Sequence, residues 1–245
     1  LLKAAMAADL NIMIAGLGGA GKTTLARALA AEISPNEPVV VMEDRRELGL
    51  HTSGRHPWAM SMETRQGHGE LDSRGRHRGE VTLADLIPVS LSLGVLRIIV
   101  GEVRGREIVA MLQAMTTSRG SICTIHARNP NSVIDRAVEL ALTHGAEMTA
   151  ELAQRMVAGA LDLIVYVNVE DETRIGGRKH RYVSHVVEVV GSGDRGQVVT
   201  TELFAPGPDG RAVPKHHPER IRDQLLRVGY DSRHLAPYIA AGNGG

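Results

Sequence analysis

The chain has 245 residues, enough for one large α/β domain, or a domain with a small appendage, around a sizeable core. Hydrophobic residues make up 43% of it but aromatic residues only 2%, so the core must be aliphatic, which favours a parallel sheet packed by helices. Lys plus Arg balance Asp plus Glu at 28 each, which excludes a global field that attracts nucleic acid or an acidic membrane. A single cysteine excludes an internal disulfide framework, and no apolar run reaches the ~20 residues that span a bilayer, so we expect a cytosolic chain.

Hydrophobic periodicity predicts strands and helices that largely alternate. The predicted strands cover residues 10–15, 39–42, 58–62, 96–100, 121–125 and 161–169. The predicted helices cover residues 21–33, 82–93, 107–117, 132–143 and 150–158, with capping-box spacing of Thr82 and Asp85 and a straining Pro88 in the second. This order predicts a mostly parallel sheet with helices on both faces and a ligand at the carboxyl ends of its strands.

The pattern changes after residue 170. Alternating runs at 182–190 and 197–204, separated by a Gly/Ser/Asp stretch, predict a β-hairpin. A short amphipathic helix is expected at about 218–228, and a disordered tail at 242–245. We therefore expect a core at residues 1–170 and an appendage at 171–245 packed on it.

A glycine-rich loop lies between the first predicted strand and helix. Its sequence, Gly-Leu-Gly-Gly-Ala-Gly-Lys-Thr at residues 16–23, has the pattern of a P-loop, whose backbone N–H groups surround nucleotide phosphates at a helix N-terminus. Lys22 is expected to reach the β and γ oxygens, and Thr23 to bind Mg²⁺. A chance glycine turn is the alternative. The expected phosphate-binding residues are Gly16, Gly18, Gly19, Ala20, Gly21, Lys22, Thr23 and Thr24.

Acidic residues follow two other predicted strands. Glu102 comes after residues 96–100 and lies beside the P-loop if the two strands are neighbours, where it can hold Mg²⁺ through water or polarise an attacking water. Glu43 and Asp44 follow residues 39–42, with Glu47 one turn further on. Because such a cluster is costly unless neutralised, Mg²⁺ or the arginines at 45, 46 and 65 should lie nearby. The alternatives are a solvated strand end and an exposed acidic turn.

Two further features point toward the same edge of the sheet. His126 ends the strand at 121–125 and can hydrogen-bond a γ-phosphate, although a structural histidine is the alternative. The loop at 64–80 carries arginines at 65, 74, 76 and 78. A solvated loop is its default interpretation, but it could supply arginines to phosphate in its own or a neighbouring subunit. Nucleic-acid binding is disfavoured because no aromatic residues interleave these charges.

Taken together, seven motifs resemble a known family. They are the P-loop, Glu43-Asp44 with Glu47-Leu48, and residues 62–65, 79–82, 98–104, 111–115 and 124–127. In order and spacing they resemble the secretion traffic ATPases of type II and type IV systems, most of all the tight-adherence pilus branch. Departures at Arg128, Ala84 and residues 93–96 indicate a divergent member. Since the sequence starts at Leu1 close to the P-loop, we expect the carboxy-terminal part of a longer protein.

The resemblance implies a RecA-like P-loop NTPase that hydrolyses ATP with Mg²⁺. It implies homohexameric rings at the cytoplasmic face of the inner membrane, on a platform protein, that drive pilin assembly or export without nucleic acid. Carried over by position, Thr23 and Glu102 serve the metal, Glu102 is the Walker B glutamate, Glu43 belongs to the Asp box, His126 contacts the γ-phosphate, and Arg65 and Arg104 contact phosphate or neighbouring subunits. The alternatives are a non-hydrolysing nucleotide-dependent scaffold and, less favoured, a small-molecule kinase.

Overall fold

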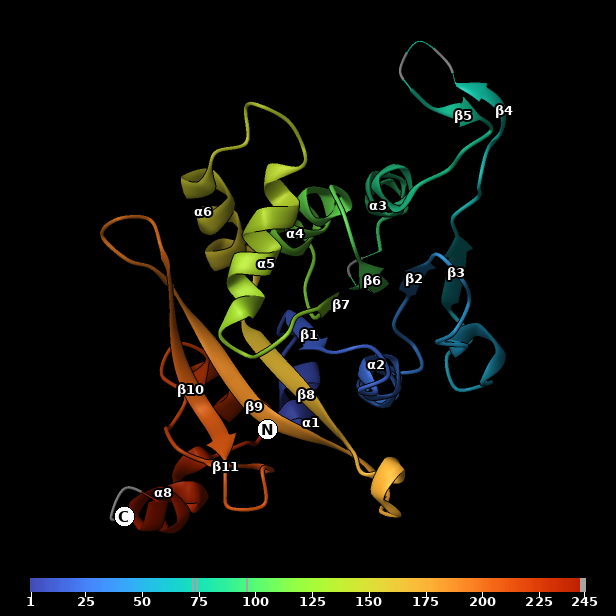
Figure 1. The fold of residues 1–245 in the computed structure, drawn as a ribbon. Coiled ribbons are helices and arrows are strands. Elements are labelled where there is room, and N and C mark those ends of the chain that lie inside the picture. The colour runs from blue at the N-terminus through green and yellow to red at the C-terminus, as the bar shows by residue number, and fades with distance from the viewer. Residues whose placement is uncertain (72, 74, 96, 243–245) are drawn as a thin grey trace.

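The computed structural model describes residues 1–71, 73, 75–95 and 97–242, and has a mixed α/β fold (Figure 1). Its strands are β1 (Ile12–Gly16), β2 (Val39–Glu43), β3 (Ala59–Glu63), β4 (His68–Leu71), β5 (His77–Arg78), β6 (Arg97–Val103), β7 (Ile122–His126), β8 (Leu163–Asp171), β9 (Lys179–Ser192), β10 (Val198–Pro206) and β11 (Ala212–Pro214). Its helices are α1 (Leu2–Ala7), α2 (Lys22–Ala30), α3 (Leu83–Ser92), α4 (Glu107–Thr117), α5 (Ser132–Leu142), α6 (Ala150–Ala160), α7 (Arg222–Arg227) and α8 (Ala236–Gly242).

Within the described residues, nine strands form one sheet in the order β11-β10-β9-β8-β1-β7-β6-β2-β3. The six strands from β8 to β3 are parallel, and β9, β10 and β11 continue the sheet in antiparallel pairs. Strand β7 lies between β1 and β6. The strand that leads into the P-loop and the strand that contains Glu102 are therefore not neighbours, contrary to the condition stated above.

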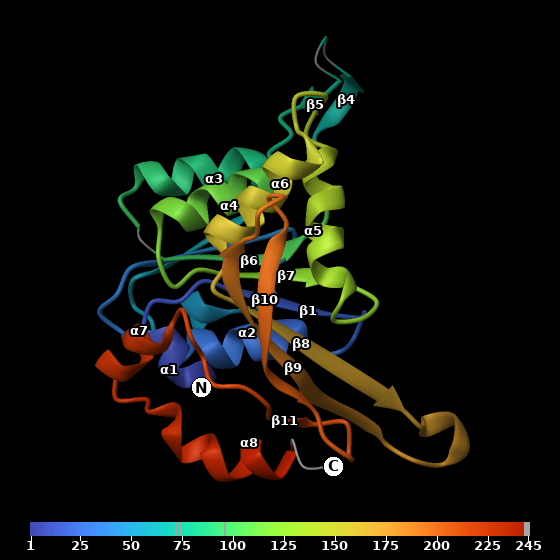
Figure 2. The same cartoon turned by 90° about the vertical axis from the view of Figure 1, so that its left-hand side faces the viewer.

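Helices cover both faces of the parallel strands (Figure 2). The side chains of β1 alternate between the two faces: Met13 and Ala15 belong to a core under α3, α4, α5 and α6, and Ile12 and Ile14 to a core shared with α1, α2 and α7. Burial on both faces explains why the strand is apolar at nearly every position. The mostly parallel, helix-covered sheet expected from the sequence is confirmed.

All six predicted strands and all five predicted core helices are present, with ends shifted by a few residues. The predicted hairpin is the β9–β10 pair, and both strands are longer than expected. The periodicity did not reveal α1, the β4–β5 pair, β11 or α8. The strands that follow residue 170 extend the main sheet, and the division of the chain at that point stays a prediction. Arg74, Leu96 and the tail residues 243–245 lie outside the described residues.

Two local predictions concern helix ends. Asp85 accepts hydrogen bonds from the backbone N–H and the hydroxyl of Thr82, both at 2.8 Å, so the predicted cap of α3 is confirmed. The helix continues through Pro88 to Ser92. Helix α7 is shorter than predicted and begins only at Arg222; the buried carboxylate of Glu188 accepts the N–H groups of Glu219 and Ile221, which precede it.

Candidate active site

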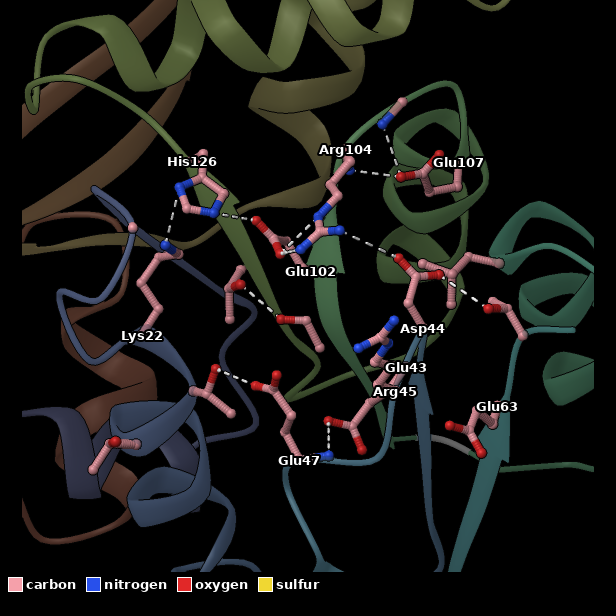
Figure 3. Close-up of a pocket in the computed structure, with 18 of the residues that line it drawn as sticks. Lys22, Glu43, Asp44, Arg45, Glu47, Glu63, Glu102, Arg104, Glu107 and His126 are labelled. Carbon is pink, nitrogen blue, oxygen red and sulfur yellow. Dashed lines mark hydrogen bonds and ion pairs between the residues drawn. The ribbon is translucent and has the colours of Figure 1, made fainter. Parts of the chain in front are cut away.

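The carboxyl ends of the parallel strands border a cleft of about 2040 Å³. Its lining includes the P-loop, the turn after β2, the segment after β3, the end of β6 and the end of β7 (Figure 3). This is the edge at which parallel α/β sheets bind ligands. The structure thus brings the motifs that follow different predicted strands to one site.

The P-loop packs tightly at its start. Gly16 ends β1 with φ +154°, and a Cβ there would lie 2.4 Å from the carbonyl oxygen of Val167 on β8, so a side chain has no room. Gly21, with φ +99°, precedes Lys22, the first residue of α2. The strand, glycine loop and helix predicted from the sequence are confirmed.

Lys22 is only 7% exposed. Its ammonium donates to the carbonyl oxygens of Gly16 and Leu17, at 3.1 Å each, and lies 3.3 Å from Nδ1 of His126. Burial lowers its pKa, and the nearby Glu102 carboxylate opposes that effect. A cation held in this way, with a partly stripped hydration shell, is suited to a phosphate anion.

His126 stands between Lys22 and Glu102, because β7 lies between β1 and β6. Burial and the Lys22 ammonium lower the pKa of His126, which favours a neutral ring that accepts from Lys22 through Nδ1 and carries its hydrogen on Nε2. Nε2 is 2.5 Å from Oε1 of Glu102, a close contact that becomes an ion pair when the ring is protonated. The strand order thus places three predicted site residues in a row of side-chain contacts.

Arg104 lies on the other side of Glu102. Its guanidinium donates twice to Oε2 of Glu102, at 2.8 Å and 2.5 Å, and this contact raises the pKa of Arg104. The same guanidinium is 3.9 Å from Asp44, whose carboxylate also accepts from the hydroxyl of Thr64 at 3.1 Å. The acidic turn is therefore neutralised in part by Arg104, whereas Arg46 pairs with Glu63.

The two glutamates of the turn after β2 have different surroundings. Glu43 is 3% exposed, and its Oε1 accepts the backbone N–H groups of Glu47 and Leu48 at 3.1 Å and 3.0 Å. A Cβ at Gly101 would lie 2.9 Å from its Cγ. Glu47 is exposed, and its Oε2 accepts from the hydroxyl of Thr23 at 3.3 Å. Glu43 thus holds the turn, and Glu47 faces the P-loop.

Arg65 lies farther along the cleft. Its backbone pairs with Val81, and its Nε donates to the carbonyl oxygen of Gly79 at 2.6 Å. These contacts hold the base of the β4–β5 pair, which projects from the body of the molecule in Figures 1 and 2. In this structure Arg65 lines the cleft but does not take part in the row of side-chain contacts that runs from Lys22 to Asp44.

Sequence reasoning did not select two residues that the structure places here. Glu47 was noted as a member of the acidic cluster and of one family motif, but not as a site residue; its place one turn beyond a predicted strand end was the signal that could have selected it. Arg181 on β9 donates from Nε to the carbonyl oxygen of Gly19 at 2.8 Å. Nothing in the sequence pairs two positions that are 162 residues apart.

The fold and the glycine loop define a RecA-like P-loop protein, and comparison with known sequences gives its family. Residues 1–216 match a family described as type II/IV secretion system proteins, and the chain belongs to that family. A putative conjugal transfer protein of Mycobacterium tuberculosis is 36% identical over 161 residues, 65% of this chain and 42% of the relative. The conjugal transfer protein TrbB of Rhizobium radiobacter is 31% identical over 208 residues, 83% of this chain and 55% of the relative. The chain spans about half the length of these curated relatives.

Solved structures agree with this family. The VirB11 ATPase of the Brucella suis type IV secretion system, crystallised with sulphate, superposes with a TM-score of 0.61 at 26% identity, covering 76% of this chain and 50% of that one. The pilus retraction motor PilT with bound ADP has a TM-score of 0.51 at 18% identity, over 74% of this chain and 48% of that one, and supports the fold alone. The family therefore includes secretion ATPases. In the part of the chain that is described, no helix is long and apolar enough to cross a membrane.

Proposed function

We propose that this chain hydrolyses ATP as a motor subunit of a type IV secretion or pilus-assembly system. The observation that carries the proposal is the convergence of Lys22, His126 and Glu102 at one end of the cleft, with Glu47 beside Thr23. A phosphate-binding cation, a hydrogen-bonding imidazole and two carboxylates are the groups that phosphoryl transfer to water requires.

In this proposal the P-loop residues Gly16, Gly18, Gly19, Ala20 and Gly21, with the N-terminus of α2 at Thr24, surround the phosphates. Lys22 exchanges its loop carbonyl contacts for phosphate oxygens, a replacement that its low exposure favours. The donor set also suits Mg²⁺, which prefers hydroxyl, carboxylate and phosphate oxygens: Thr23, and Glu102 and Glu47 through water, would hold it, and it would neutralise charge on the phosphates.

We assign the two carboxylates different tasks. Among the described residues the one hydrogen-bond partner of the Glu47 carboxylate is the Thr23 hydroxyl, so this carboxylate is available to accept a proton from the attacking water. Glu102 is held by Arg104 and lies against His126, which suits it to orient water and to change its contacts when a γ-phosphate reaches His126. Glu43 is a positioning residue that acts through the backbone of Glu47.

The larger assembly is part of the same proposal. We infer a hexameric ring at the cytoplasmic face of the inner membrane, docked on a platform protein, that couples turnover to pilin assembly or export. The support is the family membership, and the tight-adherence branch rests on the sequence resemblance alone. Arg65 and Arg104 are proposed to contact phosphate in the same or a neighbouring subunit, because both line the cleft.

Phosphate release from ATP tests the activity. Lys22→Ala and Glu102→Gln should each lower the rate by about 100-fold or more, the size expected when a phosphate ligand or a group that orients the attacking water is removed. Glu139→Gln is a matched control, because Glu139 lies exposed on α5 and pairs only with Arg136 among the described residues. Wild-type turnover in Glu102→Gln would remove Glu102 from the chemistry.

One observation favours the alternative of a nucleotide-binding scaffold. Both oxygens of Glu102 already lie against cationic or imidazole groups, an arrangement that a non-hydrolysing protein could retain. A wild-type protein that binds ATP tightly but releases no phosphate, alone or with its assembly partners, would select the scaffold and overturn the motor.

A further inference from the structure

The β8–β9 hairpin approaches the P-loop near the start, the crest and the end of the loop. At the start of the loop, the Val167 carbonyl oxygen of β8 lies 2.4 Å from where a Cβ of Gly16 would be. At the crest, Arg181 of β9 donates from Nε to the Gly19 carbonyl oxygen at 2.8 Å. At the end, a Cβ on Gly21 would lie 3.3 Å from Cδ of Arg181. The hairpin therefore forms an outer wall of the phosphate site.

The glycine conformations explain how an arginine can approach so closely. Gly19 and Gly21 have φ of +71° and +99°, which side chains other than glycine rarely adopt. Loops of this kind turn N–H groups inward to the anion, so a donor on an outer carbonyl stabilises the anion-binding conformation. A guanidinium makes a stronger hydrogen bond to a carbonyl than a neutral donor does.

The surroundings of Arg181 single it out from the other cations of the hairpin. Lys179 pairs with Asp171 at 3.1 Å; its Nζ lies 4.0 Å from where a Cβ of Gly19 would be, but no hydrogen bond joins it to the loop among the described residues. No side-chain partner of Arg178 is found in the described part of the chain. Arg181 is exposed and lines the same cleft as Lys22. Figures 1 and 2 show the hairpin extending beyond the other strands, so its far end is open to contacts that could move Arg181.

We propose that Arg181 is a positioning residue that holds the P-loop in its phosphate-binding conformation, so that the β8–β9 hairpin sets nucleotide affinity. This inference rests on the proposed nucleotide binding, but it concerns a residue outside every motif that indicated that function. It predicts that Arg181 acts on the phosphate half of the ligand through the loop and leaves the nucleoside half untouched.

Calorimetric titration of the protein with ATP, and separately with tripolyphosphate, tests the proposal. Arg181→Ala should weaken both ligands by about tenfold, which corresponds to the loss of one charge-assisted hydrogen bond. Arg181→Lys, which keeps a charged donor, should bind both ligands within about threefold of the wild type. The matched control Arg178→Ala removes one positive charge from the same hairpin and should leave both affinities unchanged. In turnover assays of Arg181→Ala, KM should rise as the affinity falls, while kcat changes less than about threefold.

Each other result overturns the proposal in a recognisable way. Wild-type affinity in Arg181→Ala would remove Arg181 while leaving the proposed function intact. A loss confined to ATP would mean contact with the nucleoside, and an equal loss in Arg178→Ala would mean a general electrostatic effect. A fall of more than about 5 °C in the Tm of the unliganded Arg181→Ala protein would show a structural role. A wild-type protein that binds neither ligand would overturn the proposed function as well.

Discussion

Replacing Glu43 and Glu47 one at a time should separate stability from turnover. Glu43→Ala leaves the part-buried N–H of Glu47 and the buried N–H of Leu48 without their acceptor, and a buried unsatisfied donor costs about 1–3 kcal/mol. We expect a loss of about 3 kcal/mol in the free energy of unfolding. In a chain of this size such a loss lowers Tm by about 6–12 °C.

Glu47→Gln should behave in the opposite way. The side chain is exposed and accepts one hydroxyl hydrogen bond, so the free energy of unfolding should change by less than about 0.5 kcal/mol. Phosphate release should fall by about 100-fold or more, because the amide cannot accept the proton of the attacking water. Glu43→Gln, which keeps an oxygen for the two N–H groups, should retain more than about a tenth of wild-type turnover.

The assays are thermal unfolding and steady-state phosphate release on the same preparations, with Glu139→Gln as the control. A Glu43→Gln variant with wild-type Tm and a 100-fold loss of turnover, on the order that removing a base produces, would make Glu43 the base. Wild-type turnover in Glu47→Gln would refute the assignment of Glu47.

Three further predictions concern other parts of the fold. Arg97 is 2% exposed and ion-paired with two carboxylates, so Arg97→Ala should lower the unfolding free energy by about 3–5 kcal/mol in urea titrations; a loss below about 1 kcal/mol would contradict this. Hydrogen bonds from Arg76 and Thr82 lower the pKa of Asp85 from its ordinary value of 3.8 to about 2. The carboxylate therefore contributes its full stabilisation above pH 3.8, and this stabilisation is lost as the pH falls toward 2. The stability difference between wild type and Asp85→Asn should therefore shrink on acidification, and a difference independent of pH would speak against the ion pair. In an NMR titration the His126 ring should protonate below pH 6.5, and Lys22→Met should raise that midpoint; a midpoint above 6.5 in the wild type would contradict the lowering of this pKa by burial and Lys22.

The parts of the site that could be predicted from the sequence are those formed by residues close to one another in the chain. The P-loop could be recognised because strand, glycines, lysine and threonine are contiguous, and their conformations follow from the residues themselves. Glu102 and His126 could be placed at one edge because parallel strands end on the same side. The roles of Glu43 and Glu47 could not be separated, because burial of a carboxylate depends on the chain that packs over it: here Gly101 permits Glu43 to lie against β6.

By itself the sequence determined the alternation of strands and helices, the aliphatic core with its parallel sheet, and the phosphate loop, since each follows from local periodicity or from contiguous residues. Only the tertiary structure decided the strand order, which inserts β7 between β1 and β6 and so places His126 between Lys22 and Glu102. It alone also brought Arg181 against Gly19. Both depend on pairings between distant segments, whose register and neighbours are set by the packing of the whole sheet and are not encoded in any single stretch of residues.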